Sequence, residues 1–326
     1  MQSKLVTPEA AASTAVEHTP QLGVSSPAER SGRGLLPGFD RLRVLGLVLI
    51  VLAVGVAASA LLGPLVLHQM HYRTSATTHN QLTGGDVVSL FVVAPLALVA
   101  GVLALRRHPV APLLALGPAL YVVYTFTQLV IGQEYLRLPG NVERYFPLLL
   151  AVFILGEVAL VLGWGAVPAD LPAPSRRLER IAGTTLILVA VFLVFGLHLP
   201  SVLAAWQHPS TLTEYASSPT PFWMVKLMDL GIVVPAALAT GIGVLRGSGW
   251  ARRAMYAMLT GYTCLAIAVA AMAVVMLVRH DPDASAAVAG GFAVFAAAFV
   301  TLSVALYRPL FPSHGTSRSV TGGRRP

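Results

Sequence analysis

Eight long apolar runs, separated by short polar connections, dominate this chain. Each run is long enough to cross the hydrocarbon core of a bilayer as a helix, at about 1.5 Å per residue. Backbone groups inside a membrane must satisfy their own hydrogen bonds, so helices are the expected state. The pattern predicts an all-α fold, a polytopic transmembrane helix bundle. The predicted spans are residues 43–67, 86–105, 110–132, 146–167, 181–205, 222–245, 253–278 and 287–307.

Composition strengthens the membrane interpretation. Of the 326 residues, 56% are hydrophobic and 11% are charged, and the mean hydropathy is +0.73. Soluble domains carry about a quarter charged residues, and a soluble core of this size has no room for so much apolar surface. We therefore expect the lipid bilayer as the main partner. The net charge of +8 does not indicate nucleic acid, because the basic residues fall mostly in short connections between apolar runs.

The distribution of Lys and Arg predicts the orientation of the spans. If the eight spans alternate in direction, 17 of the 22 basic residues fall on one side of the membrane. The other side holds Arg73, Arg137, Arg144, Lys226 and Arg279. Cytoplasmic loops carry the excess of positive charge, so both termini are predicted to be cytoplasmic.

The chain divides into five predicted segments. Its ends, residues 1–40 and 309–326, are rich in small and polar residues without apolar periodicity, which is typical of disordered tails. Between these cytoplasmic tails we predict two transmembrane units of four helices each, residues 41–167 and 181–308. A cytoplasmic linker, residues 168–180, joins the two units.

The second and sixth apolar runs share a sequence pattern. Residues 95–106, PLALVAGVLALR, align with residues 235–246, PAALATGIGVLR, with Pro, Ala, Leu, Gly, Leu and Arg in register. With a shift of one position from this register, Tyr121 in the third run falls on Tyr262 in the seventh. We interpret the match as a 4+4 tandem repeat whose halves point the same way across the membrane. The alternative is a resemblance that arises from apolar composition alone.

The most unusual residue inside a predicted span is Glu157. A carboxylate at the bilayer centre costs roughly 2.5 kcal/mol or more, so such a residue usually faces a cavity or a partner. Counted from the inner ends of the runs, five residues share one layer near the midplane: Glu157, Pro95, Pro235, Tyr121 and Tyr262. Midplane sites between repeats are typical of secondary transporters, which predicts a site for a small solute or ion in this layer. The alternative is that the tyrosines pack, the prolines bend helices and a neutral Glu157 ties two helices together.

Polar residues near the outer ends of the spans form a second candidate cluster. Its histidines are His68, His71, His198 and His208. Histidines can ligate a metal or flank a haem, but no cysteine or acid at ligand spacing supports such a site here. Asp86 opens the second run, and Lys226 and Asp229, three positions apart, are predicted to form a local ion pair near the start of the sixth.

Enzyme motifs are missing from the sequence: it contains no phosphate-binding loop, no HExxH pair and no GxSxG elbow. This favours a protein that is not an enzyme.

The connection at residues 133–146 alternates in charge, and we interpret it as a helix–helix turn made by Pro139 and Gly140. The alternative is a gate over an outer opening.

Two short segments carry a resemblance to a known family. The stretches EYLRLPGN, residues 134–141, and FWMVKLMD, residues 222–229, resemble segments of uncharacterised bacterial multi-span inner-membrane proteins. The resemblance implies a location in the bacterial inner membrane, and it implies no particular chemistry.

Three functions are open at this point. The first is a transporter with Glu157 as the titrating group of a midplane site. The second is a membrane-embedded haem or metal redox protein that uses the outer histidines. The third is a structural or assembly subunit of a membrane complex. The repeat and the intramembrane acid favour the transporter, while the substrate, the cofactor content and the oligomeric state stay open.

Reporter fusions test the predicted topology. Alkaline phosphatase is active only outside the cytoplasm, so fusions that end near residues 74, 141, 210 and 283 should be active. Fusions that end near residues 108, 172 and 248 should be inactive. An inverted pattern would place both termini outside, and a pattern that changes phase along the chain would show that the number of spans is wrong.

Overall fold

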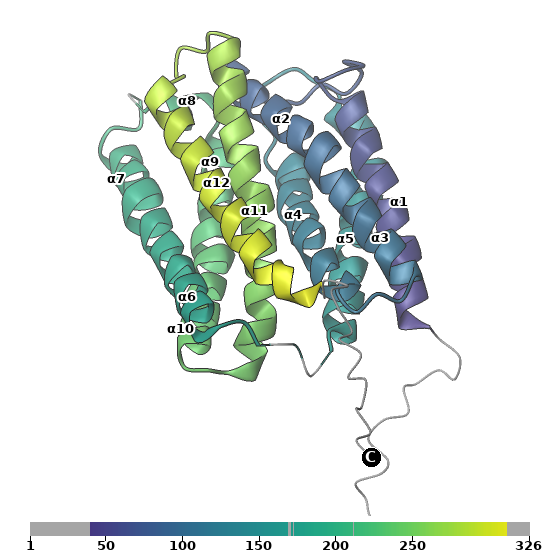
Figure 1. Ribbon diagram of the computed structural model, residues 1–326. Helices are drawn as coiled ribbons and strands as arrows, with labels where there is room; N and C mark the ends of the chain where they lie inside the picture. Colours follow the sequence, from purple (N-terminus) through teal and green to yellow (C-terminus); the bar gives the residue numbers. More distant parts are fainter. Residues whose placement is uncertain (1–39, 169–170, 172, 211, 312–326) are drawn as a thin grey trace, which may run out of the picture. The chain divides into compact units, whose positions relative to one another are not determined.

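Long helices make up all the spans of the described chain. The computed structural model describes residues 40–168, 171, 173–210 and 212–311. Eight helical segments in this part of the chain are long and apolar enough to cross a membrane, which confirms the predicted number of spans (Figure 1). The predicted tails lie outside the described residues, apart from Asp40 and residues 309–311. The fold is that of a multi-pass, all-helical membrane protein.

The first four spans form one group of helices. In chain order its elements are α1 (Arg41–Leu62), α2 (Ala76–Val88), the π-helical segment η2 (Ser89–Val93), α3 (Ala94–Leu105), α4 (Ala111–Ile131), the 3-10 turn η3 (Val142–Tyr145) and α5 (Phe146–Ala166). The second span consists of α2, η2 and α3 in one continuous helix. In this group α1 packs on α3 and α5, and α4 packs on the same two helices.

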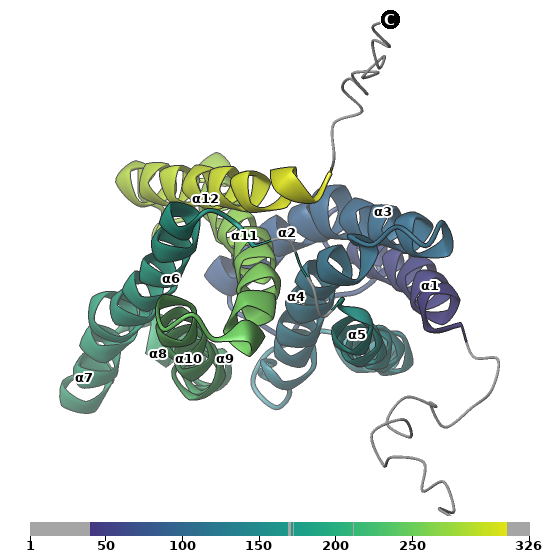
Figure 2. The same ribbon diagram turned by 60° about the horizontal axis from the view of Figure 1, so that its bottom comes forward.

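The last four spans form a second group. Its elements are α6 (Arg176–Val191), η4 (Phe192–His198), α7 (Leu199–Gln207), α8 (Thr213–Ser217), α9 (Pro219–Met228), η5 (Asp229–Val233), α10 (Val234–Leu245), α11 (Gly249–Val278), α12 (Ala286–Tyr307) and η6 (Arg308–Leu310). Here η4 and η5 are π-helical and η6 is a 3-10 turn. The two groups lie side by side, and α11 joins them by packing against α2 and α4 (Figure 2).

The second span begins well before its predicted start at Asp86, because a polar segment extends the helix. The helix starts at Ala76, after Ser75, whose hydroxyl oxygen accepts a hydrogen bond from the Thr78 N–H at 3.3 Å. This capping bond satisfies one of the free N–H groups at a helix N-terminus.

At the opposite end of the first group, Asp40 caps α1 and accepts a hydrogen bond from Arg107 at 2.6 Å. This bond lowers the pKa of the Asp40 carboxyl group.

Three spans contain a π-helical segment, and in each a proline follows as the second residue of the next helix. These prolines are Pro95, Pro200 and Pro235. Proline has no N–H and its ring clashes with the carbonyl four residues back, which disfavours a regular α-helical turn. In each case the residue before the proline donates instead to the carbonyl five residues back. The donor and acceptor pairs are Ala94 with Ser89, Leu199 with Val194 and Val234 with Asp229.

Glycine contacts hold the first two spans of each group together. A Cβ atom on Gly101 would lie 3.0 Å from the carbonyl oxygen of Gly46, and one on Gly241 would lie 2.7 Å from that of Gly183. Both contacts join the first span of a group to its second span. Small residues at such crossings allow close approach of helix backbones, which is how helices associate in lipid.

Substitution of these glycines tests the close packing. Gly101→Leu and Gly241→Leu should each lower the free energy of unfolding by about 1–3 kcal/mol, because the added side chain meets backbone atoms. Thermal unfolding of the detergent-purified protein measures the effect. Gly290→Leu is the matched control, since a Cβ atom there meets nothing within 4 Å. Equal unfolding midpoints for the three variants would contradict the packing.

Candidate functional site

A cavity of 770 Å³ lies between the two helix groups. Side chains of α2 and α4 line it from the first group, and side chains of α9, η5, α11 and α12 line it from the second. It reaches Ser75 and Ser217 at the end of the bundle that we call the outer end, after the predicted topology. Its volume lies within the range of pockets that hold small organic ligands.

Two of the five residues predicted for the midplane layer line this cavity: Tyr121 and Tyr262. The hydroxyl group of Tyr121 lies 3.1 Å from that of Ser89 and donates to the Gly85 carbonyl at 3.3 Å. The hydroxyl group of Tyr262 donates to the Val233 carbonyl at 3.0 Å. Each tyrosine thus binds the π-helical region of the neighbouring span in its own group.

Pro95 and Pro235 lie on the exposed side of their helices and do not line the cavity. The widened turn before Pro235 carries Asp229, which lines the cavity, and the turn before Pro95 carries Ser89, whose hydroxyl group contacts that of Tyr121. Glu157 is exposed on the side of α5 that faces away from the bundle, and it is not on the cavity wall. Within the described part of the chain, no hydrogen bond or ion pair is formed by its carboxyl group.

Four carboxyl groups line the cavity, and among the described residues no Lys, Arg or His does. Asp86 and Asp229 are buried within the bundle, whereas Glu214 of α8 and Asp283 of the α11–α12 connection lie toward the outer end. A cleft lined by charges of one sign, with walls of low dielectric, concentrates ions of the opposite sign. The cavity is therefore suited to a positively charged occupant.

Asp229 is held by two side chains from different spans. Its Oδ1 accepts a hydrogen bond from the Tyr124 hydroxyl at 2.7 Å, and its Oδ2 lies 2.8 Å from Nε2 of His198. His198 is the last residue of η4, so two π-helical segments meet in this pair. Histidine–carboxylate pairs inside membranes are a common element of proton relays. From the sequence, His198 was predicted as a possible metal ligand, and Tyr124 was not identified as a site residue.

Asp86 has much weaker protein contacts than Asp229. Its only hydrogen-bond donor among the described residues is the hydroxyl of Tyr72, at 3.4 Å and 3.5 Å from the two carboxyl oxygens. Burial raises the pKa of Tyr72 well above its ordinary value, so this hydroxyl group stays protonated and donates. No basic side chain of the described chain forms an ion pair with Asp86. A carboxylate can accept about four hydrogen bonds, so most of the acceptor capacity of Asp86 is free.

The four predicted metal ligands do not meet at one position. His68 and His71 are exposed in the connection between α1 and α2, His198 pairs with Asp229, and His208 follows the end of α7. Over the residues that the structure describes, no group of three or more His, Cys, Asp or Glu side chains is placed to hold a metal ion.

Lys226 and Asp229, predicted to pair with each other, have different partners. Nζ of Lys226 lies 3.7 Å from a carboxyl oxygen of Glu214 and 3.2 Å from the centre of the Phe222 ring. Asp229 pairs with His198 instead. On a helix, residues three apart share a face, but each side chain here turns to a neighbour from another segment.

The connection at residues 133–146 is docked on the segment after α1. The Asn141 side chain accepts a hydrogen bond from the His71 N–H at 2.7 Å and donates to the Gln69 carbonyl at 2.9 Å. The buried carboxylate of Glu134 accepts from the Thr220 N–H at 2.7 Å, at the N-terminus of α9. A negative charge is favourable at a helix N-terminus. These bonds hold the connection as a fixed turn.

Comparison of the chain with protein-family models, with curated proteins and with solved structures finds no match. The class that the fold and the site define is that of a multi-pass helical membrane protein with a buried, carboxylate-lined cavity.

The hydrogen bond between Tyr124 and Asp229 is open to a direct test. Tyr124→Phe should lower the free energy of unfolding by about 1–3 kcal/mol, because a buried carboxyl oxygen loses its donor. Tyr135→Phe is the control, since it removes an exposed hydroxyl group that donates to the Val130 carbonyl near the end of α4. In an Asp229→Asn background the effect of Tyr124→Phe should shrink. Equal effects of the two Tyr→Phe changes would show that the bond contributes nothing.

Proposed function

We propose that the protein transports a small solute or ion, with the cavity between the helix groups as its binding site. The position of this cavity carries the proposal. It lies between two groups of four spans and has Tyr121, Tyr262 and the buried Asp86 and Asp229 on its walls. In many transporters one helix unit rocks against another around a site at their interface, so that the site opens to each side of the membrane in turn.

The proposal includes the 4+4 repeat, with units at residues 41–167 and 181–308 and a linker at 168–180. Two observations support it. The segments η2 and η5 begin at aligned positions of the two units, Ser89 and Asp229, and each precedes a proline in the same position. The glycine contact between Gly46 and Gly101 has a counterpart between Gly183 and Gly241. The proposal also includes cytoplasmic termini in a bacterial inner membrane.

Asp229 takes the role in this proposal that the sequence suggested for Glu157. It is a buried carboxyl group on the cavity wall, and its partner His198 can exchange a proton with it. Glu157 lies outside the cavity, so its substitution by Gln should leave the binding site intact. The roles of Tyr121 and Tyr262 stay as predicted, on the wall of the site.

Cysteine accessibility tests transport without knowledge of the substrate. Cys264 is the only cysteine, and Cys264→Ala provides a background without thiols. In this background Thr125→Cys and Gln128→Cys place a thiol on the cavity wall. Thr301→Cys is the control, on the exposed face of α12 within its span. A charged, membrane-impermeant methanethiosulfonate reagent should label the two cavity cysteines both in right-side-out and in inside-out vesicles.

The control cysteine should stay unlabelled from both sides, because lipid suppresses the thiolate that reacts. Labelling of the cavity from the outer side alone would contradict transport and indicate a receptor or binding protein. Labelling from neither side would favour the structural subunit. Only access from both sides agrees with a transporter.

A further inference from the structure

We propose that the cavity binds an amphipathic organic cation, which reaches it from the bilayer through a groove between α6 and α12. The inference rests on the proposed transport function and names its substrate class. Three features carry it: a side opening in the second helix group, a row of aromatic rings behind this opening, and a cavity wall with unbalanced negative charge.

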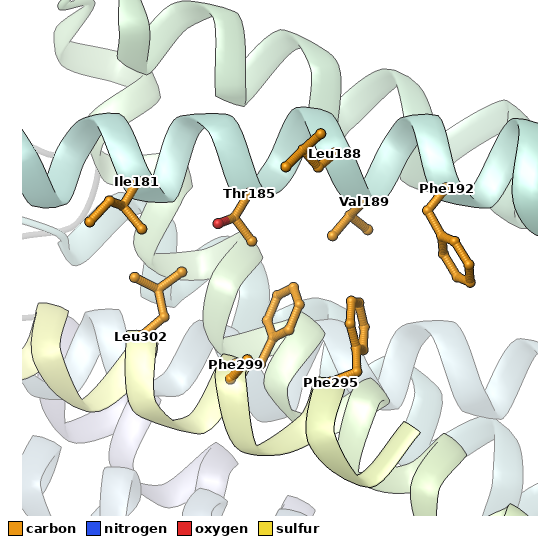
Figure 3. A pocket seen from close by; sticks show the side chains of 9 residues that line it. Ile181, Thr185, Leu188, Val189, Phe192, Phe295, Phe299 and Leu302 are labelled. Carbon is orange, nitrogen blue, oxygen red and sulfur yellow. The ribbon is translucent and has the colours of Figure 1, made fainter. Parts of the chain in front are cut away.

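The groove has a volume of 480 Å³ and lies between α6 with η4 on one side and α12 on the other. Ile181, Thr185 and Val189 of α6 face Phe295, Phe299 and Leu302 of α12 across it (Figure 3). Apart from the Thr185 hydroxyl group, its side chains are apolar. The groove is therefore compatible with the hydrocarbon part of a molecule dissolved in lipid.

The groove continues into the cavity between the helix groups. Four residues line both spaces: Val189, Phe192, Phe295 and Phe299. A molecule in the groove is thus separated from the cavity by side chains alone, with no backbone between. Side chains can change rotamer in nanoseconds, so they can admit a ligand without movement of a helix.

The corresponding pair of helices in the first group is closed. There α1 packs along α5, and a Cβ atom on Gly55 would lie 2.7 Å from Cγ2 of Val152. The register that matches Gly46 with Gly183 places Phe192 at the position of Gly55. A phenyl ring in place of a hydrogen atom keeps α6 and α12 apart. The opening is therefore a property of the second group.

Aromatic rings form a row from the groove into the cavity. The ring centroids of Phe192 and Phe295 lie 6.4 Å apart, those of Phe295 and Phe299 lie 4.8 Å apart, and those of Phe299 and Tyr262 lie 6.2 Å apart. The faces of aromatic rings attract cations, and they also pack well against apolar groups. The row suits a molecule that combines positive charge with apolar bulk.

The charge of the cavity wall disfavours an anionic substrate. With four carboxyl groups and no basic side chain among the described lining residues, the wall disfavours an anion. Asp229 lies 2.8 Å from His198 and Glu214 pairs with Lys226, but Asp86 is buried without a basic partner. A buried carboxylate without a counterion is costly, and a cationic ligand would remove this cost.

Two probes of equal shape and opposite charge test the substrate class. The purified full chain in lipid nanodiscs is titrated with tetraphenylphosphonium and, separately, with tetraphenylborate. Tetraphenylphosphonium should bind saturably and raise the Tm, and tetraphenylborate should do neither. Equal binding of the two ions, or stronger binding of the anion, would overturn the inference. This comparison uses the unaltered protein and does not depend on the folding of any variant.

Two carboxyl variants locate the site. Asp86→Asn should weaken tetraphenylphosphonium binding by at least about tenfold, because it removes a desolvated ion pair with the ligand. Glu157→Gln makes the same change of charge within a span but outside the cavity, and should leave the affinity unchanged. Equal losses in the two variants would place the cation elsewhere. Far-UV circular dichroism checks that each variant is folded.

A third variant tests the route. Ala298 lines the groove but not the cavity, so Ala298→Trp should fill the groove and slow the association of membrane-dissolved tetraphenylphosphonium several-fold, with unchanged affinity. An unchanged association rate would show that the cation enters from the aqueous outer end.

The proposal of a cationic substrate and the proposal of transport can fail separately. If the cavity is accessible from both sides but binds no cation, the cationic substrate is refuted and transport is not. If it binds the cation but is accessible from one side only, transport is refuted and the cationic ligand is not.

Discussion

The need to satisfy every backbone hydrogen bond inside a bilayer governs this structure. Water is absent from the hydrocarbon region, so a broken helical turn would leave polar groups without partners. In three spans a proline follows a π-helical segment: Pro95, Pro200 and Pro235, whereas Pro118 lies within the α-helix α4 without one. Each of the three spans keeps its hydrogen bonding by widening the preceding turn into a π-helical segment. Two of these segments bring His198 and Asp229 to within 2.8 Å of each other, so the backbone solution also creates the buried acid–base pair.

The same helices must pack closely in one place and leave space in another. Glycine allows the close approach: a Cβ atom on Gly84 would overlap the backbone of Met272 where α2 crosses α11, and one on Gly117 would overlap the Thr260 side chain where α4 crosses α11. These crossings join the two helix groups. Farther along the same helices, side chains such as Tyr121 line the cavity. Glycine along α2 and α4 thus marks where the groups touch.

The sequence was sufficient for the number of spans, since apolar length alone identifies them. It was not sufficient for the direction in which side chains point. Glu157 and Tyr121 were predicted at the same depth, yet Tyr121 lines the cavity and Glu157 lies on the outer surface. Rotation of a helix about its axis depends on its neighbours, and the low contrast between faces of an apolar helix does not reveal it. The pair of His198 and Asp229 was missed for a related reason, because it joins two spans whose mutual packing the sequence does not contain.

In the proposed repeat, what the halves share and what they do not share serve different purposes. The glycine contacts and the π-helical segments recur in both halves, and they determine how two neighbouring spans pack in each half. In the register that aligns Pro95 with Pro235, Asp86 corresponds to Lys226 and Ser89 to Asp229, so charge is distributed differently in the two halves. Lys226 pairs with Glu214, and no basic side chain is among the described lining residues of the cavity. In the proposed transporter, two similar units form the framework, and their differences give the site its excess of acids. A perfectly symmetric pair would have repeated each polar group in the equivalent position, and the uneven distribution of acids that favours a cation would not have arisen.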